Sequence, residues 1–257
     1  MPPLSLDLSH RVAVVTGGAG ELGRTICRTL ADCGAAVAVH YHSKSSQAKA
    51  IADEIVGKGG RAEAFGADIT KFEDVISLHH QITSSLGLAD VIVTNAVIQY
   101  DWTSVLDQPL EDYEGQFRSC VMQNVHMAKA FVPAIIQKGA GGRIVAINTE
   151  CAMQNFPSQS AYTSGKRGMD GLLRVLAKEI GEHQITVNQV APGWTRSDRI
   201  RAMDDDPQVG YAANVPLKRA GTDQEIANVV AFLASDLASY ITGAYVPVCG
   251  GNVMPTI

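Results

Sequence analysis

A tyrosine and a lysine stand four residues apart in the segment Tyr162-Thr-Ser-Gly-Lys166. On a helix this spacing places the phenol and the ammonium one above the other on the same face. A nearby cation favours the phenolate, and it brings a group with an ordinary pKa of about 10 closer to use as an acid or base at neutral pH. The pair therefore predicts proton transfer to or from an alcohol oxygen. The alternative is a solvated helix face, on which such pairs arise by chance.

A glycine-rich turn follows the first apolar segment of the chain. Residues 11–16 have the composition of a buried parallel strand, residues 17–23 contain four glycines, and an amphipathic helix is expected from about Arg24. Glycines permit close backbone approach, and the free N–H groups and dipole at a helix start attract a pyrophosphate. The unit predicts a nucleotide-binding turn, with a plain tight connection as the alternative.

Length and composition limit the classes of partner. The 257 residues carry a net charge of -5 and show no linker-like stretch, so we expect one large α/β domain over residues 1–257. The acidic balance disfavours a nucleic-acid surface, since the arginines of residues 196–201 are diluted by the acidic run at residues 204–206. No apolar stretch reaches the roughly 18 residues of a membrane span. We expect a cytoplasmic protein with a small-molecule partner and neither nucleic acid nor membrane.

The cysteines and histidines predict no metal site. Five cysteines without a C-x-x-C spacing support neither a disulfide framework nor a zinc centre. His79 and His80 are neighbours on a predicted helix, where their side chains point in different directions.

Seven apolar runs alternate with helical patterns along the chain. They cover residues 11–16, 36–40, 61–66, 90–95, 143–148, 185–190 and 244–249. This alternation predicts a doubly wound, Rossmann-type fold with a seven-stranded parallel sheet and helices on both faces. Ligands of such sheets gather outside the carboxyl ends of the strands, where Gly17, Asn95, Thr149 and Pro192 are expected to lie.

The composition of two further segments suggests where they lie in the fold. Residues 196–216 are rich in charge and lack a steady hydrophobic period, which predicts a substrate lid or, alternatively, a solvated insertion. Pro247 lies inside the last apolar run and favours an edge strand that faces a partner subunit.

Several motifs occur in one order and at matching separations along nearly the whole chain. They are Thr16-Gly17 through Gly23, Asp68-Ile69, Asn95-Ala96, Tyr162 with Lys166, and Pro192-Gly193, with Gly142-Arg-Ile-Val145 and Ser239-Tyr-Ile-Thr-Gly243 in addition. This ordered set resembles the short-chain dehydrogenase/reductase family, and within it the 3-oxoacyl-carrier-protein reductase and sugar or polyol dehydrogenase types.

The resemblance implies an oxidoreductase that interconverts a ketone and a secondary alcohol by hydride transfer. It implies that Tyr162 is the general acid/base and that Lys166 both lowers the pKa of the phenol and holds the nicotinamide ribose. Thr149 aligns with the family's serine, which hydrogen-bonds the substrate oxygen. The alternative for Thr149 is a plain β-branched strand residue.

The resemblance also implies a set of residues that bind the cofactor. No carboxylate occurs in residues 37–44, at the end of the second apolar run, where NAD users place one against the ribose 2′-hydroxyl. We therefore favour NADP over NAD, with a polar loop start as the alternative. The expected cofactor-binding residues are Gly17, Leu22, Tyr41, His42, Ser43, Asp68, Ile69, Asn95, Ala96, Tyr162, Lys166, Pro192 and Thr195.

Three residues depart from the family's pattern. Glu21 replaces the middle glycine of the turn, Val97 follows Asn95-Ala96 in place of a glycine, and Cys120 aligns with the catalytic asparagine that supports a helix irregularity. These departures motivate an alternative function, a cofactor-binding protein with a degenerate active site that acts in regulation or assembly. Asn124, one turn after Cys120, is a candidate substitute for the lost amide.

The resemblance also implies an oligomeric state, and the sequence offers candidates for the substrate pocket. A homotetramer is implied, with the helices at residues 110–137 and 160–182 as its contact, although the apolar faces of these helices could be satisfied against the sheet. The pocket candidates are Tyr100, Trp102, Gln154 and Trp194, which are compatible with sugars, acyl thioesters or bulky ketones.

Overall fold

Seven strands form one parallel sheet in the order β3-β2-β1-β4-β5-β6-β7. The computed structural model describes residues 6–195 and 208–254. The strands are β1 (Val12–Val15), β2 (Ala36–Tyr41), β3 (Arg61–Gly66), β4 (Val91–Thr94), β5 (Gly142–Ile147), β6 (Ile185–Pro192) and β7 (Tyr245–Val248). The predicted seven-stranded parallel sheet is confirmed, and the strand ends differ from the predicted ones by at most two residues.

Helices connect consecutive strands, as parallel pairing requires. They are α1 (Glu21–Asp32), α2 (Ser45–Gly57), α3 (Phe72–Ser85), α4 (Leu110–Gln116), α5 (Gln123–Lys138), α6 (Cys151–Gln154), α7 (Ser160–Ile180), α9 (Val209–Asn214) and α10 (Asp223–Ala234). A π-helix (Phe117–Met122) joins α4 to α5, and short 3-10 turns occupy Gly181–His183 and Asp236–Ala238. None of the helices in the described residues has the length and apolar character needed to cross a membrane.

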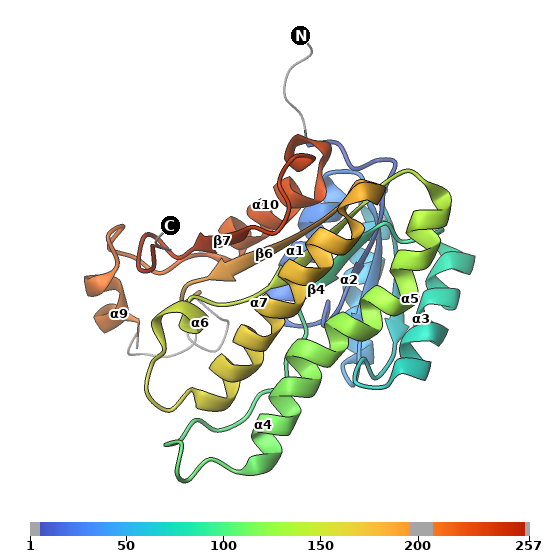
Figure 1. Ribbon diagram of the computed structural model, residues 1–257. Coiled ribbons are helices and arrows are strands. Elements are labelled where there is room, and N and C mark those ends of the chain that lie inside the picture. The colour runs from blue at the N-terminus through green and yellow to red at the C-terminus, as the bar shows by residue number, and fades with distance from the viewer. Residues whose placement is uncertain (1–5, 196–207, 255–257) are drawn as a thin grey trace.

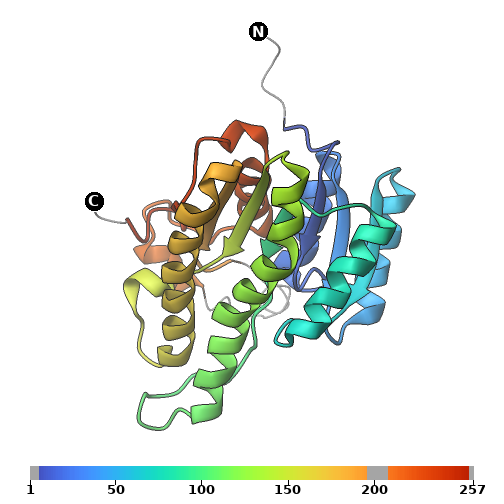
Figure 2. The same cartoon turned by 45° about the vertical axis from the view of Figure 1, so that its right-hand side comes forward.

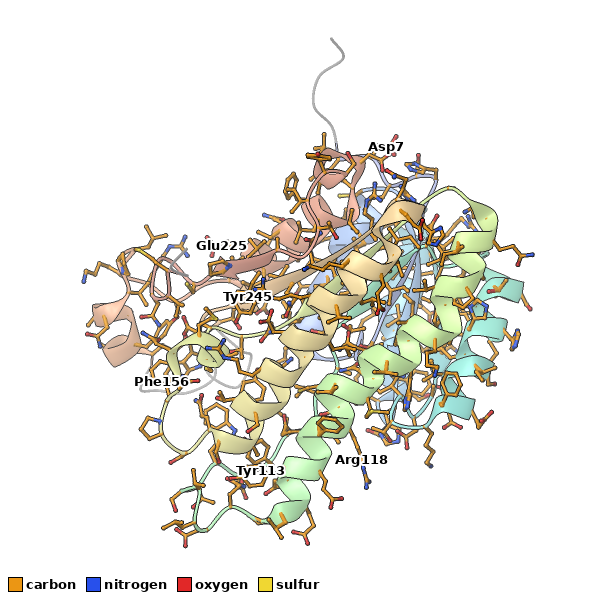
Figure 3. The ribbon with its side chains drawn as sticks, viewed as in Figure 1. Asp7, Tyr113, Arg118, Phe156, Glu225 and Tyr245 are labelled. Carbon is orange, nitrogen blue, oxygen red and sulfur yellow. The ribbon has the colours of Figure 1, made fainter. Side chains whose placement is uncertain are left out.

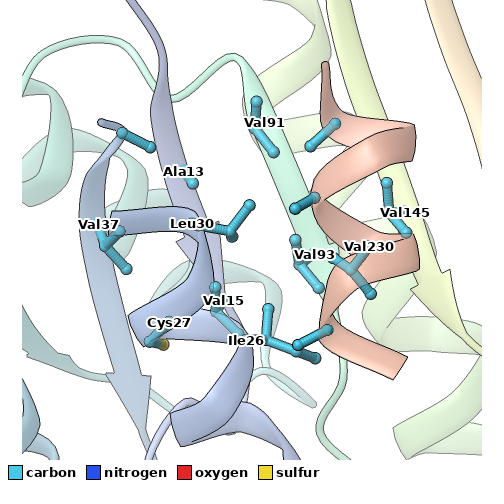
Figure 4. Close-up of a cluster of buried hydrophobic side chains, with 14 of the residues drawn as sticks. Ala13, Val15, Ile26, Cys27, Leu30, Val37, Val91, Val93, Val145 and Val230 are labelled. Carbon is cyan, nitrogen blue, oxygen red and sulfur yellow. The ribbon is translucent and has the colours of Figure 1, made fainter. Parts of the chain in front are cut away.

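The helices cover both faces of the sheet. Alternate strand residues point to opposite faces, so that Val15 contributes to the core under α1, α2 and α10, while Val14 contributes to the core under α3, α5 and α7. Figures 1 and 2 show these two layers on either side of the sheet. In Figure 4 the side chains of Ile26 and Leu30 on α1 and of Val230 on α10 meet strand valines such as Val93. Burial on both faces explains why the strands read as continuous apolar runs.

The strand order reverses between β1 and β4, because β1 pairs with β2 on one side and with β4 on the other. At such a reversal the connecting helices leave toward opposite faces, which opens a crevice at the carboxyl ends of the strands. β7 forms one edge of the sheet, as Pro247 predicted.

A cluster of ion pairs, partly buried, lies at the opposite, amino-terminal end of the sheet. Asp90 is 2% exposed and lies 3.4 Å from Arg11 and 3.3 Å from Lys138. Asp236 lies 2.8 Å from Arg11 and 2.9 Å from Arg143. These charges pair with one another far from the crevice and hold the strand starts together.

Two elements differ from the expectation. The first helix begins at Glu21 and not near Arg24, since Gly20 precedes the first turn in extended conformation and the carboxylate of Glu21 suits the positive end of the helix dipole. The expected irregular segment at residues 196–216 includes the helix α9, and its residues 196–207 lie outside the described part of the chain.

Candidate active site

The first two turns of α7 bring the predicted tyrosine and lysine together. Lys166 is 3% exposed, and its Nζ lies 5.7 Å from the centre of the Tyr162 ring. The two side chains therefore share one helix face, as the four-residue spacing predicted. A buried lysine against an aromatic ring contradicts the alternative of a solvated helix face.

Thr149 lies immediately beyond the end of β5 and is 6% exposed. Its side chain hydrogen-bonds the Tyr162 phenol. Its hydroxyl also accepts the N–H of Cys151 at 3.2 Å, and its carbonyl accepts the hydroxyl of Tyr245. Tyr245, labelled in Figure 3, reaches this point from β7. Thr149 is thus held beside the phenol by groups from α6 and β7.

A series of hydrogen bonds, which no spacing in the sequence indicated, surrounds Lys166. The ammonium donates to the carbonyl oxygen of Ile147 at 2.6 Å. The amide of Asn148 donates to the Lys166 carbonyl at 3.3 Å and to Gln189 Oε1 at 2.6 Å, and Gln189 in turn donates to Asp170 at 2.7 Å. Each amide and carbonyl in this hydrogen-bonded series has a partner, which orders Lys166 beside the Tyr162 ring.

Burial dominates the protonation of both groups. It raises the pKa of Tyr162 well above its usual value, against the opposing hydrogen bond from Thr149. It lowers the pKa of Lys166, because the ammonium is removed from water. Burial therefore sets the direction of the Tyr162 pKa shift, and the expectation that Lys166 lowers the pKa of the phenol stays a prediction. The neutral phenol is the resting form at neutral pH.

Aromatic side chains stand around the catalytic pair. Trp102 stacks on Tyr162 with ring centres 6.2 Å apart, and the hydroxyl of Tyr100 accepts the Tyr162 N–H at 2.6 Å. Trp194 meets Tyr211 edge to face at 5.7 Å. Trp102 is 52% exposed and Trp194 is 41% exposed, so large apolar surface is open to a ligand. Three of the four pocket candidates therefore lie beside Tyr162 or beyond the neighbouring strand end.

The glycine turn has the geometry that a dinucleotide needs. Gly17 has φ of +63°, which favours glycine, and a Cβ on Gly23 would overlap the carbonyl oxygen of Gly17. Gly20 caps α1 without a side-chain hydrogen bond, so that the N–H groups of the first turn, including that of Leu22, remain available to an anion. These residues fit the pyrophosphate of NAD(P).

Asn95 and Ala96 close the turn from the neighbouring strand. The Asn95 amide donates to the carbonyls of Thr16 and Gly17 at 3.0 and 3.2 Å. The Thr16 hydroxyl accepts the N–H groups of Asn95 and Ala96 at 2.9 and 3.1 Å and donates to Gln123 Oε1 at 3.1 Å. The ends of β1 and β4 and the start of α5 are therefore joined at the point where the strand order reverses.

His40 was not predicted as a site residue, yet it holds the turn. It is 1% exposed; its Nδ1 accepts the Gly17 N–H at 3.1 Å, and its Nε2 lies 3.1 Å from the Ala67 carbonyl. The carbonyl of His40 also accepts the Gly18 N–H at 2.8 Å. This pattern requires the neutral Nε2–H tautomer. The only signal in the sequence was its place at the end of a strand.

The remaining cofactor candidates lie along the same edge of the sheet. Tyr41 is partly buried, and His42 and Ser43 are exposed just after β2. Asp68 accepts the N–H and the hydroxyl of Thr70 at 3.0 and 2.6 Å, which orders the turn before α3, but the N-cap of α3 is Lys71 and it has no side-chain cap hydrogen bond. Burial opposes ionisation of Asp68, but the hydrogen bonds from Thr70 lower its pKa overall. Ile69 follows Asp68 and is 6% exposed.

Pro192 and Thr195, the last two cofactor candidates, lie at the end of β6 and three residues beyond it. Pro192 pairs with β7, and its carbonyl accepts the N–H of Glu150. The Thr195 carbonyl accepts the amide of Gln208 at 3.1 Å. Thr195 and Gln208 are thus in direct contact, and Pro192 lies against the residue that follows Thr149.

Cys120 lies inside the π-helix and is fully buried. Its Sγ lies 3.8 Å from Gln116 Oε1. Asn124 donates to the Cys120 carbonyl at 2.7 Å and accepts the Thr94 hydroxyl at 2.7 Å. The helix irregularity expected at this position is therefore present without an asparagine side chain. Asn124 braces the irregular turn and β4, and no contact joins it to Lys166 among the described residues.

The geometry first defines a class: a doubly wound α/β protein with a dinucleotide-binding turn at its switch point and a tyrosine, a lysine and a threonine at the neighbouring strand ends. The family described as Enoyl-(Acyl carrier protein) reductase matches residues 17–252. The 3-oxoacyl-acyl-carrier-protein reductase of Staphylococcus epidermidis is 36% identical over 255 residues, which cover 95% of this chain and all of that protein.

Solved structures give the same result. A short-chain type dehydrogenase/reductase from Mycobacterium marinum has a TM-score of 0.87 at 32% identity and covers 97% of this chain and 98% of its own. A blue fluorescent protein from a metagenomic library, solved in complex with NADPH, has a TM-score of 0.87 at 32% identity and covers 98% of this chain and 100% of its own.

The chain belongs to the short-chain dehydrogenase/reductase family. It is an NAD(P)-dependent oxidoreductase that interconverts a ketone and a secondary alcohol by hydride transfer.

Proposed function

We propose that this protein is an NADPH-dependent carbonyl reductase in which Tyr162 is the general acid, Thr149 binds the substrate oxygen and Lys166 positions the phenol. One observation carries the proposal. The buried Lys166 side chain, the partly buried Tyr162 ring and the buried Thr149 side chain meet where the end of β5 approaches α7.

The protonation states suit the reductive direction. When bound, the nicotinamide supplies the hydride for the substrate carbon. Burial keeps the Tyr162 phenol protonated, so that it can donate its proton to the carbonyl oxygen as negative charge develops there. The Thr149 hydroxyl can hold the same oxygen, because it already reaches the phenol. Lys166, anchored on the Ile147 carbonyl, fixes the orientation of the ring.

NADP preference rests on the end of β2. No carboxylate occurs in residues 37–44, and the exposed polar side chains of His42 and Ser43 are positioned to meet a 2′-phosphate. The structural relative in complex with NADPH supports this preference. Fluorescence titration with NADPH and NADH tests it directly. Tighter binding of NADH would overturn the preference and leave the reaction in place.

The test of the reaction is a matched pair of tyrosine variants. Purified protein should oxidise NADPH with a ketone from a panel that includes acetoacetyl esters. Tyr162→Phe should reduce the rate by at least about 100-fold, since a positioned acid contributes that much or more. Tyr240→Phe removes the same hydroxyl from a fully exposed residue and should leave the rate unchanged. A wild-type rate no higher than that of Tyr162→Phe across the panel would overturn the proposal.

Several expectations stay predictions. They are a single domain over residues 1–257, a substrate lid at residues 196–216, a homotetramer and a cytoplasmic location. The acyl-carrier-protein reductases among its relatives make acyl thioesters the first substrates to test.

A further inference from the structure

A buried carboxyl group follows the substrate-binding threonine directly, and the roles described above do not use it. Glu150 is 3% exposed. Its Oε2 accepts the amide of Asn252 at 3.0 Å, and its carboxylate accepts a hydrogen bond from the hydroxyl of Tyr211. Burial raises the pKa of Glu150 against these hydrogen bonds. A carboxyl group that is kept in such surroundings needs these partners.

The partners of Glu150 come from three segments that flank the catalytic strand end. The N–H of Trp194, just after β6, donates to the Tyr211 hydroxyl at 3.0 Å. Tyr211 belongs to α9, and Asn252 belongs to the segment after β7. The amide of Asn252 also donates to Gln154 at 3.2 Å. The carboxylate of Glu150 therefore lies at the centre of a hydrogen-bonded cluster that joins the ends of β5, β6 and β7 to α9.

The hydroxyl of Tyr211 packs closely against the backbone of Gly193. A Cβ on Gly193 would overlap the Tyr211 hydroxyl. The phenol is therefore seated directly against the backbone of the β6 end, where only glycine leaves room. A small shift of α9 would break both the bond to the Trp194 N–H and the bond to Glu150.

We propose that Glu150 is a positioning residue for substrate binding, which acts through Tyr211 to fix Trp194 and α9 beside Thr149. The inference rests on the proposed function, because it assigns the supporting structure of the same pocket. Trp194 presents open aromatic surface next to the catalytic strand end, so the position of its backbone sets the shape that a ketone meets. Glu150 does not take part in proton transfer, which remains with Tyr162.

The test is a double-mutant cycle with steady-state kinetics at saturating NADPH. Glu150→Ala and Tyr211→Phe should each raise the KM for the ketone at least about tenfold and leave kcat within threefold, because the reacting groups stay in place. The double variant should raise KM by less than the product of the two single effects, since Glu150 and Tyr211 bond each other and both bond the Trp194 N–H. Glu150→Gln should recover most of the affinity, because its amide oxygen still accepts from Tyr211.

Controls separate a positioning role from general support of the fold. Glu182→Ala removes a carboxylate whose side chain is 80% exposed and should change neither constant. If Glu150→Ala does not fold, Tyr211→Phe and Glu150→Gln carry the test. A KM within twofold of wild type, a fall in kcat alone, or effects that multiply in the double variant would overturn the inference while Tyr162→Phe still supports the proposed function. A wild type no more active than Tyr162→Phe would remove both.

Discussion

Acidification should destabilise this protein through His40 specifically. The ring is 1% exposed and is neutral in the native state, where it accepts the Gly17 N–H and donates to the Ala67 carbonyl. Burial lowers its pKa from an ordinary 6.5 to about 4, the Ala67 carbonyl opposes this fall, and the nearby His42 and Asp68 act in opposite directions. In the unfolded chain the same ring takes up a proton below about pH 6.5.

The sign and size of the effect follow from linkage. Between pH 6.5 and 4 the unfolded state binds more protons than the native state at this site, so stability falls as the pH falls. With the pKa at about 4 in the native state and 6.5 in the unfolded state, the loss between pH 7 and pH 5 is about 2 kcal/mol. Below pH 4 both states are protonated and the loss levels off.

The assay compares wild type with His40→Asn, which does not titrate and can keep an acceptor near the Gly17 N–H. Urea unfolding of both proteins at pH 7 and pH 5, at one protein concentration, cancels the contributions of the other histidines and carboxylates. Wild type should lose about 2 kcal/mol more than the variant. Losses that agree within about 0.5 kcal/mol would refute the assignment of a neutral, hydrogen-bonded His40.

The remaining predictions concern packing and charge. Gly23→Ala places a Cβ against the Gly17 carbonyl. It should abolish NADPH binding in titrations and destabilise the protein by about 1–3 kcal/mol. Gly57→Ala has open space at the end of α2 and should be neutral or stabilise the protein by up to about 1 kcal/mol. Asp90→Ala removes a buried partner from Arg11, which keeps Asp236, and from the partly exposed Lys138, and should cost about 1–3 kcal/mol in urea unfolding. Glu54→Ala removes a partly exposed ion pair and should cost less than about 1 kcal/mol. Equal losses in the two acidic variants would contradict the role of burial.

Much of the fold was predictable because burial on two faces leaves a simple pattern. The central strands β1, β4 and β5 are rich in buried apolar residues, and the helical patterns between the strands set their limits. Pro247 favoured an edge position. Gly17, Asn95, Thr149 and Pro192 were expected to share one edge of the sheet, because parallel strands all end there. The four-residue spacing of Tyr162 and Lys166 gave their common helix face.

The rest of the site depends on contacts between segments far apart in the sequence, which no local spacing encodes. Glu150 meets Asn252 across 102 residues, and His40 reaches the turn at Gly17 across 23. Burial raises the pKa of Tyr162, and the sequence shows the cation at Lys166 but not how far distant segments cover the phenol.

The hydroxyl of Thr16 joins the end of β1 to the end of β4 and to the start of α5. It accepts two backbone N–H groups after β4 and donates to the side chain of Gln123 at the start of α5. A displacement of any of these parts would leave a buried polar atom without its hydrogen-bond partner. The ends of β1 and β4 and the start of α5 should therefore move as one unit.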